Sequence, residues 1–322
     1  MVGDGPAQQD NTFTPPVVIA TPAPGTSSSR KSPSEIPFGT LPDTITVGAP
    51  YAPPGAFEGQ YELQDNFAVD QDTFNNWQAA AIASNGEHLF IAAVDNSPSK
   101  GTLLKMNVEG KDWEDLGDSF LSRVSLGATG YVMKHTLGSL AVNVSGTALI
   151  SDATEGLYSY EKEVRPLKLS PGARQIVFAH DRYILLTPRG LEQLQVSSST
   201  EAPTPFESEL PPGELPKVMG KSPEGELFVA TGTQIFRLEA SGEATALVSL
   251  EDPALRALSA DAEGNLFGLY ADRILWWKPT GESKTLAEGD LISPVGLVWA
   301  GGSLYVADAG TSSKTSVILQ FR

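Results

Sequence analysis

Short apolar segments alternate with polar turns along most of the chain, and the same unit recurs at intervals of about forty residues. In each unit an apolar strand, a tight turn and a more hydrophobic strand follow one another, as in 295–307. In a sixth unit, at 180–186, Asp181 and Arg182 replace the turn glycine that the other five units carry. Those five glycines are Gly86, Gly146, Gly225, Gly264 and Gly302. Because one hairpin cannot bury both of its faces alone, this repetition predicts a radial array of blades.

Each hairpin is followed by a third strand in which apolar and polar residues alternate. The six candidates are 102–106, 156–160, 190–194, 234–238, 273–277 and 317–321. Five units add a polar outer strand, for example at 164–169, 244–250 and 283–286. The pattern therefore predicts an all-β fold, a six-bladed β-propeller of four-stranded blades.

The last unit along the chain shows no outer strand of its own after 317–321. A propeller has to close its ring, because an open ring exposes two sheet edges. We expect a strand within 60–70, just upstream of the first blade, to pair with 317–321 and complete the last blade. The interval between the first and second units is longer than the others, and we interpret 119–136 as an insertion, since a seventh blade would be cramped there.

The last unit, 293–310, resembles the NHL-repeat consensus. It has Pro-x-Gly at 294–296, an apolar strand, a glycine turn and then Leu-Tyr-Val-Ala-Asp at 304–308. The other units keep the turn and the second strand in part, and the unit at 180–186 departs furthest. The resemblance implies a six-bladed propeller. It leaves the function open, because propellers of this kind include binding and scaffolding modules as well as lactonases.

Composition separates a tail from the repeats. Of the 24 prolines, 11 lie in residues 1–55, among many serines and threonines. We therefore expect 1–56 to be an extended or disordered tail and 57–322 to be the propeller. A Thr/Pro/Ser-rich leader before an all-β domain looks like the tether of an exported bacterial protein, which favours a periplasmic, cell-surface or secreted location. A cytoplasmic linker of the same composition is the alternative.

The net charge of the chain limits the classes of partner that we expect. It has 39 acidic and 22 basic residues and a net charge of −17, and it has no cysteine. Nucleic acid is disfavoured as a partner, because affinity for it rests on phosphate neutralisation by Lys and Arg. No apolar run approaches the ~18 residues that span a bilayer. The sequence favours protein partners, with a membrane contacted only indirectly through the tail.

The residues that end the second strands are candidates for a site, because we expect these ends to meet around one mouth of the central channel. By alignment they are Ala93, Asp152, Thr187, Thr231, Tyr270 and Asp308, with Asn96 just beyond the first. Propeller lactonases of the gluconolactonase type hold calcium with Glu, Asn and Asp at such a mouth. Asp152, Asp308 and Asn96 would make a poor cage, so we expect the two aspartates to bond backbone N–H groups, and we expect no metal, no cofactor and no catalytic residue.

Candidate partner-binding residues lie mainly in the tail. Its one apolar cluster combines prolines with β-branched residues, which suits an extended peptide that docks on a partner. The candidates are Phe13, Pro15, Pro16, Val17, Val18, Ile19, Trp77 and Trp113. The sequence thus favours a non-enzymatic protein-interaction or structural module, tethered by its tail to a larger extracytoplasmic or surface assembly. The alternative is a periplasmic or secreted lactonase-type hydrolase with a metal at the propeller mouth.

Overall fold

The computed structural model describes residues 63–68, 77–95, 101–109, 112, 114–116, 137–152, 156–162, 164–167, 173–196, 202–279, 282–289, 291–309 and 316–321. These residues form six four-stranded antiparallel sheets, and none of them is helical. The predicted all-β six-bladed propeller of four-stranded blades is therefore confirmed. The predicted tail and the insertion at 119–136 lie outside the described residues, and the domain boundary after residue 56 stays a prediction.

Each blade has the same order of strands from the channel outward. The inner strands are β2 (Trp77–Ser84), β6 (Leu137–Val142), β10 (Gln175–Ala179), β14 (Val218–Lys221), β18 (Ala257–Ala260) and β22 (Pro294–Ala300). The second strands are β3 (His88–Asp95), β7 (Ala148–Asp152), β11 (Arg182–Thr187), β15 (Leu227–Ala230), β19 (Leu266–Leu269) and β23 (Ser303–Asp308). The third strands are β4 (Gly101–Asn107), β8 (Gly156–Tyr160), β12 (Gly190–Leu194), β16 (Gln234–Leu238), β20 (Arg273–Trp277) and β24 (Val317–Phe321). The outer strands are β5 (Glu114–Asp115), β9 (Val164–Pro166), β13 (Thr204–Pro205), β17 (Ala244–Ser249), β21 (Ser283–Glu288) and β1 (Leu63–Ala68).

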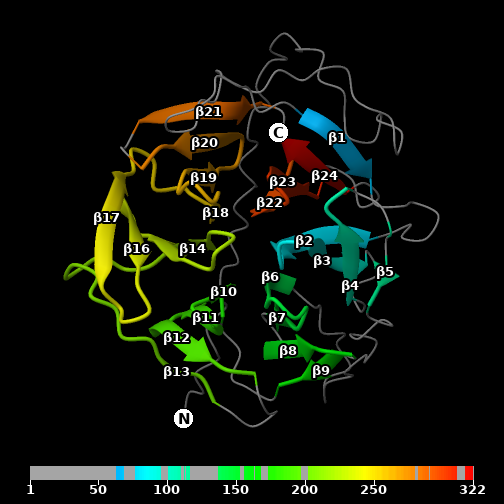
Figure 1. The fold of residues 1–322 in the computed structure, drawn as a ribbon, viewed down its shortest axis with the longest axis horizontal. Helices are drawn as coiled ribbons and strands as arrows, with labels where there is room; N and C mark the ends of the chain where they lie inside the picture. The colour runs from blue at the N-terminus through cyan, green and yellow to red at the C-terminus, as the bar shows by residue number, and fades with distance from the viewer. Residues whose placement is uncertain are drawn as a thin grey trace, which may run out of the picture. The chain divides into compact units, whose positions relative to one another are not determined.

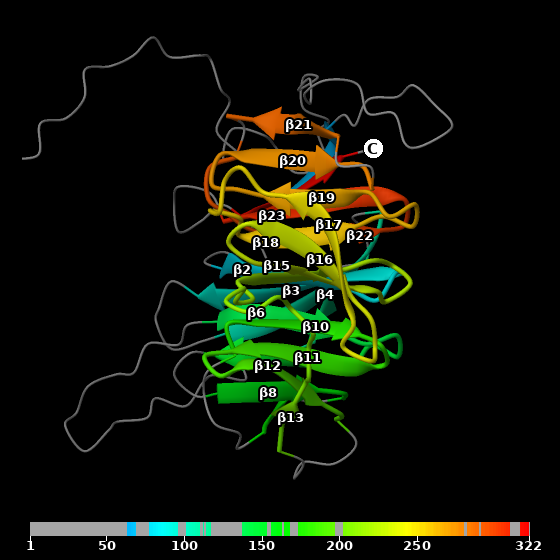
Figure 2. The ribbon, with the colours of Figure 1, turned by 90° about the vertical axis from the view of Figure 1, so that its left-hand side faces the viewer.

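The inner strands form a closed ring around a central channel. Each packs on the next in chain order, and β22 packs on β2 to complete the circle (Figure 1). Seen from the side, the strands run roughly parallel to the channel axis (Figure 2). The hydrophobic core consequently lies in six seams between neighbouring blades.

The last blade is closed by the strand nearest the N-terminus, as predicted. β1 pairs antiparallel with β24, from Leu63 opposite Phe321 to Ala68 opposite Val317. The register shifts once, between Leu63 and Asp65. Because β1 covers the edge of β24, the ring is joined by backbone pairing between segments far apart in the sequence.

The third strands match the predicted ranges well. Five of the six begin and end at the predicted residues, and β4 extends the predicted 102–106 by one residue at each end. In β20 the adjacent Trp276 and Trp277 face opposite seams. Trp276 belongs to the core cluster that contains Phe321 of the last blade, and Trp277 to the cluster that contains Phe228 of β15. Both tryptophans are buried, so both faces of this strand are packed.

The repeated glycine serves a recurrent hairpin turn. In one copy the Gly225 N–H donates to the Ser222 carbonyl at 3.1 Å, and the Ser222 N–H donates to the Glu226 carbonyl at 3.1 Å. Gly225 has a φ of +85°, in the left-handed region that glycine enters most easily. The pattern is a type I turn followed by a residue in the left-handed region, a common hairpin connection. It recurs at Asn143–Gly146 and Asp261–Gly264, so the first position is polar each time.

The hairpin of β10 and β11 differs from this pattern. We expected Asp181 and Arg182 to form its turn, and this was wrong by one residue. Ala179 pairs with Arg182, and the turn residues are His180 and Asp181, with φ of 50° and 58°. Two successive positive φ values define the mirror-image two-residue turn that hairpins favour. The His180 ring is held on the next blade, with Nε2 at 2.8 Å from the Leu238 carbonyl oxygen.

Candidate functional site

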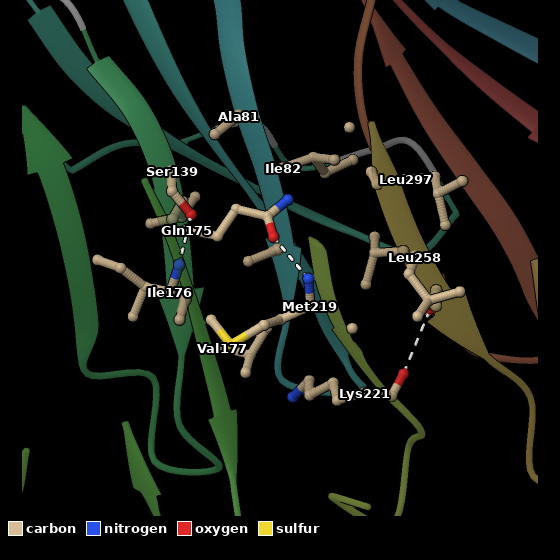
Figure 3. A pocket seen from close by; sticks show the side chains of 18 of the residues that line it. Ala81, Ile82, Ser139, Gln175, Ile176, Val177, Met219, Lys221, Leu258 and Leu297 are labelled. Carbon is tan, nitrogen blue, oxygen red and sulfur yellow. Dashed lines mark hydrogen bonds between the residues drawn. The ribbon is translucent and has the colours of Figure 1, made fainter. Parts of the chain in front are cut away.

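The most distinctive feature of the described structure is the cavity of the central channel. It has a volume of ≈ 230 Å³ and is lined by the inner strands of all six blades. Much of its wall is apolar, including Ile82, Val177, Leu258 and Leu297 (Figure 3). The inner strands also carry small residues, so the backbones approach closely; a Cβ at Gly220 would lie 2.1 Å from the backbone oxygen of the neighbouring β18.

Side chains tie the inner strands to one another along their free edges. The Ser139 Oγ accepts a hydrogen bond from the Ile176 N–H at 2.8 Å, and the Gln175 Oε1 accepts one from the Met219 N–H at 2.6 Å (Figure 3). The Gln175 Nε2 also donates to the Arg256 carbonyl at 3.2 Å. These bonds satisfy backbone groups that no strand pairs. They also join strand beginnings to strand beginnings, so the inner strands all start at the same end of the channel.

A set of basic residues stands at this end. In three consecutive blades the residue just before the inner strand is basic, and its N–H donates to the carbonyl at the end of the second strand. The pairs are Arg174 with Leu186 at 2.7 Å, Lys217 with Ala230 at 2.8 Å, and Arg256 with Leu269 at 2.8 Å. The three side chains are exposed, and the repeated backbone bond shows that they occupy equivalent positions. We call Arg174, Lys217 and Arg256 the basic mouth.

Two acidic side chains in the loops that lead into β14 and β18 are already engaged. Asp252 pairs with Arg273 at 2.5 Å. Glu214 accepts a hydrogen bond from Thr233 Oγ1 at 2.7 Å. Hydrogen bonds from hydroxyl groups and the charge of Lys217 lower the pKa of Glu214, so it is ionised at neutral pH. Within the described residues, the guanidinium groups of Arg174 and Arg256 form no ion pair.

The charged side chains described in the lining of the channel are all basic. The charged residues that line the cavity are Arg174, Lys221 and Arg256, and no acidic residue is among its described lining. The chain as a whole has 39 acidic residues against 22 basic ones. The channel is therefore a positively charged hollow in an acidic protein, and its walls favour an anionic group.

Lys221 lies at the opposite end of the channel from the basic mouth. It is the last residue of β14, and its Nζ donates to the Ser84 carbonyl at 3.2 Å. Ser84 ends β2, which lies three inner strands away in either direction, so the side chain crosses the channel to the opposite blade. Burial lowers the pKa of Lys221 to about 8, because desolvation disfavours the ammonium form.

The predicted ring of second-strand ends lies one strand farther out. None of Ala93, Asp152, Thr187, Thr231, Tyr270 and Asp308 lines the channel cavity. The Asp308 carboxylate accepts hydrogen bonds from the Ile292 N–H at 2.7 Å and the Ser293 N–H at 2.8 Å, the backbone role expected for it. Asp152 is buried. The described residues contain no group of three or more acidic or histidine side chains arranged to hold a metal ion.

Most predicted partner-binding residues lie outside the described residues. These are Phe13, Pro15, Pro16, Val17, Val18, Ile19 and Trp113, together with the metal candidate Asn96. Trp77 begins β2, and only its backbone is described. Sequence reasoning missed the basic mouth and Lys221. The available signal was a basic residue just before the inner strand in three successive units, and a lysine at the end of an otherwise apolar strand.

Comparison with known proteins supports the fold. The structure is similar to a gluconolactonase from Xanthomonas campestris, with a TM-score of 0.54 and 11% identity over 88% of this chain and 99% of that chain. It is also similar to YCF48 bound to D1 peptide (TM-score 0.46, 11% identity, 80% and 82% of the two chains). A further match is the nidogen/laminin complex (TM-score 0.48, 15% identity, 69% and 85%).

At 11% identity the likeness to the gluconolactonase shows the fold alone. No protein-family model matches the sequence, and no curated protein sequence matches it. The narrower resemblance to NHL repeats stays a prediction. In the described part of the chain, no helix is long and apolar enough to cross a bilayer.

Proposed function

We propose that this chain is a non-enzymatic protein-interaction module that binds an acidic segment of a protein partner at the basic mouth. The observation that carries the proposal is the repeated placement of Arg174, Lys217 and Arg256 at equivalent positions around one end of the channel. The tail, 1–56, tethers the propeller to a larger extracytoplasmic or surface assembly. Its Thr/Pro/Ser-rich composition supports that role and location.

Three cations at one mouth suit carboxylate recognition. Arg presents a planar fork of donors that matches a carboxylate, and charge-assisted hydrogen bonds are stronger than neutral ones. Because the protein carries a net charge of −17, an acidic partner is repelled by most of the surface and attracted at this mouth. Such a contrast selects the orientation of binding as well as the partner.

The mouth can be tested with peptide probes. A fluorescein-labelled hexaglutamate peptide should bind the full chain with an affinity that falls as salt is raised, and a hexaglutamine peptide should bind far more weakly. Replacing Arg174, Lys217 and Arg256 together by Gln should lower hexaglutamate affinity at least tenfold. The matched control replaces Lys105, Lys162 and Lys278 by Gln, which removes the same charge toward the other ends of the strands. Equal losses in both variants would refute a site at the mouth.

The tether is tested separately. Pull-downs with the full chain, with a chain lacking 1–56, and with a chain in which 15–19 is replaced by a Gly/Ser run should differ if the tail docks on a partner. The Gly/Ser replacement preserves reach and removes side chains. Docking predicts that it loses the partner as completely as the deletion does. Capture retained after the replacement would show that the tail is a spacer.

A further inference from the structure

Lys221 is a cation whose hydrogen-bonding capacity is only partly used. An ammonium group has three N–H donors, and the one described partner of this group is the Ser84 carbonyl. No acidic residue is among the described residues that line the channel. Burying a charge is costly, and the cost is smaller when the charge is paired and hydrogen-bonded. The lowered pKa of Lys221 reflects this incomplete solvation.

The space beside Lys221 suits a small amphipathic molecule. The cavity volume of ≈ 230 Å³ is many times the roughly 10–15 Å³ that one water molecule needs, so the channel has room for a small organic ligand. Its wall includes Ile82, Leu258 and Leu297, which offer a surface to hydrocarbon (Figure 3).

The hydroxyl groups near Lys221 are already engaged. The Ser84 Oγ donates to the His88 carbonyl at 2.9 Å and accepts from the Gly86 N–H at 2.9 Å. The Ser259 Oγ donates to the Lys221 carbonyl at 3.4 Å and accepts from the Trp299 N–H at 3.1 Å. This end of the channel thus presents one ammonium group and few other donors, which matches a carboxylate better than a phosphate with its larger charge and three oxygens.

We propose that the channel binds a small aliphatic carboxylate, with the carboxylate group paired to the Lys221 ammonium and the hydrocarbon part packed on the apolar wall. Arg174 and Arg256 line the same cavity and are exposed, so the basic mouth draws anions toward the entrance. The proposal does not depend on a protein partner. Lys221 is separated from the mouth by the length of an inner strand, so its role can be tested apart from that of the arginines.

The test uses sodium hexanoate, which has eight non-hydrogen atoms, titrated into the full chain by calorimetry against sodium chloride of equal ionic strength. We expect saturable binding at one site per chain, and binding of the neutral hexanamide at least tenfold weaker. Lys221→Met keeps the volume and removes the charge, and it should lower hexanoate affinity at least tenfold. Lys162→Met, the same change at an exposed lysine, should leave the affinity unchanged.

A second measurement uses the unmutated side chain. Lysine amines labelled by ¹³C-dimethylation each give an NMR resonance, and hexanoate should shift the one that is absent from the Lys221→Met spectrum. The proposal is overturned by absence of saturable hexanoate binding, by equal affinity in Lys221→Met, by equal binding of hexanamide, or by a shift confined to another lysine. Hexaglutamate binding that requires Lys221, without hexanoate binding, would also overturn it, because the carboxylate would then belong to a protein partner.

Discussion

Replacing Lys221 by methionine is expected to stabilise the protein. The pKa of Lys221 falls from 10.5 to about 8 on folding, and this shift corresponds to about 3 kcal/mol at neutral pH. The variant removes that penalty and keeps an unbranched side chain of similar length. It also loses the hydrogen bond to the Ser84 carbonyl, worth about 1 kcal/mol. The expected net gain is therefore about 2 kcal/mol, or a rise in melting temperature of about 4–8 °C for a domain of this size.

The gain should depend on pH in a defined direction. Below pH 8 both folded and unfolded chains carry the ammonium group, so the wild-type protein bears the whole desolvation penalty. Between pH 8 and 10.5 the folded protein loses this proton before the unfolded chain does, so wild-type stability recovers relative to the variant. Above pH 10.5 both states are neutral and the charge-dependent part of the gain is gone.

Urea unfolding of both proteins at pH 7, 9 and 10.5, followed by intrinsic fluorescence, measures this difference directly. Lys162→Met serves as the control, because an exposed lysine should change stability by less than about 0.5 kcal/mol. A variant that is less stable than wild type at pH 7, or more stable by the same amount at every pH, would refute the argument from desolvation. A confirmed gain would indicate that Lys221 is retained at the expense of stability, as residues of binding sites often are.

Three other predictions follow from the fold. Deletion of 1–72 removes β1 and should destabilise the whole propeller by about 3 kcal/mol or more, since several backbone hydrogen bonds are lost and an edge is exposed; an unchanged melting temperature would show that β1 is dispensable. Gly220→Ala should cost about 2 kcal/mol or more, whereas Gly138→Ala, where a Cβ meets nothing within 4 Å, should be nearly neutral by the same urea measurement. Calcium should leave the melting temperature unchanged; a rise that is abolished when Asp152 and Asp308 are both replaced by Ala would favour the lactonase-type alternative.

The blade architecture could be predicted from sequence because each strand is set by a local pattern. The position of 273–277 directly after a hairpin of the repeat identified it as a third strand, and the glycine marked turns such as that at Gly225. The turn of the third blade was misplaced by one residue because His180 and Asp181 adopt positive φ without a glycine to mark them. Those residues enter this region more readily than most, yet neither identity is diagnostic.

The site was harder to predict because it depends on which strand faces the channel. Sequence reasoning chose the ends of the second strands, where Asp152 and Asp308 stand out as carboxylates in apolar surroundings. The structure lines the channel with inner strands instead. Lys221 meets Ser84 only because the ring brings opposite blades together. No local pattern encodes such a contact.

Pairing of β1 with β24 also constrains how the protein can fold during synthesis. Leu63 and its partner Phe321 are separated by 258 residues (321 − 63), so β1 leaves the ribosome long before its partner exists. At about 5–20 residues per second, the wait lasts about 13–50 s. During that time the blades already made cannot close into a ring, because the last blade and its inner strand β22 have not been synthesised. Folding therefore ends in a late step that pairs β1 with β24. Until β24 has been made, chaperones or neighbouring chains would meet an incomplete ring with exposed sheet edges.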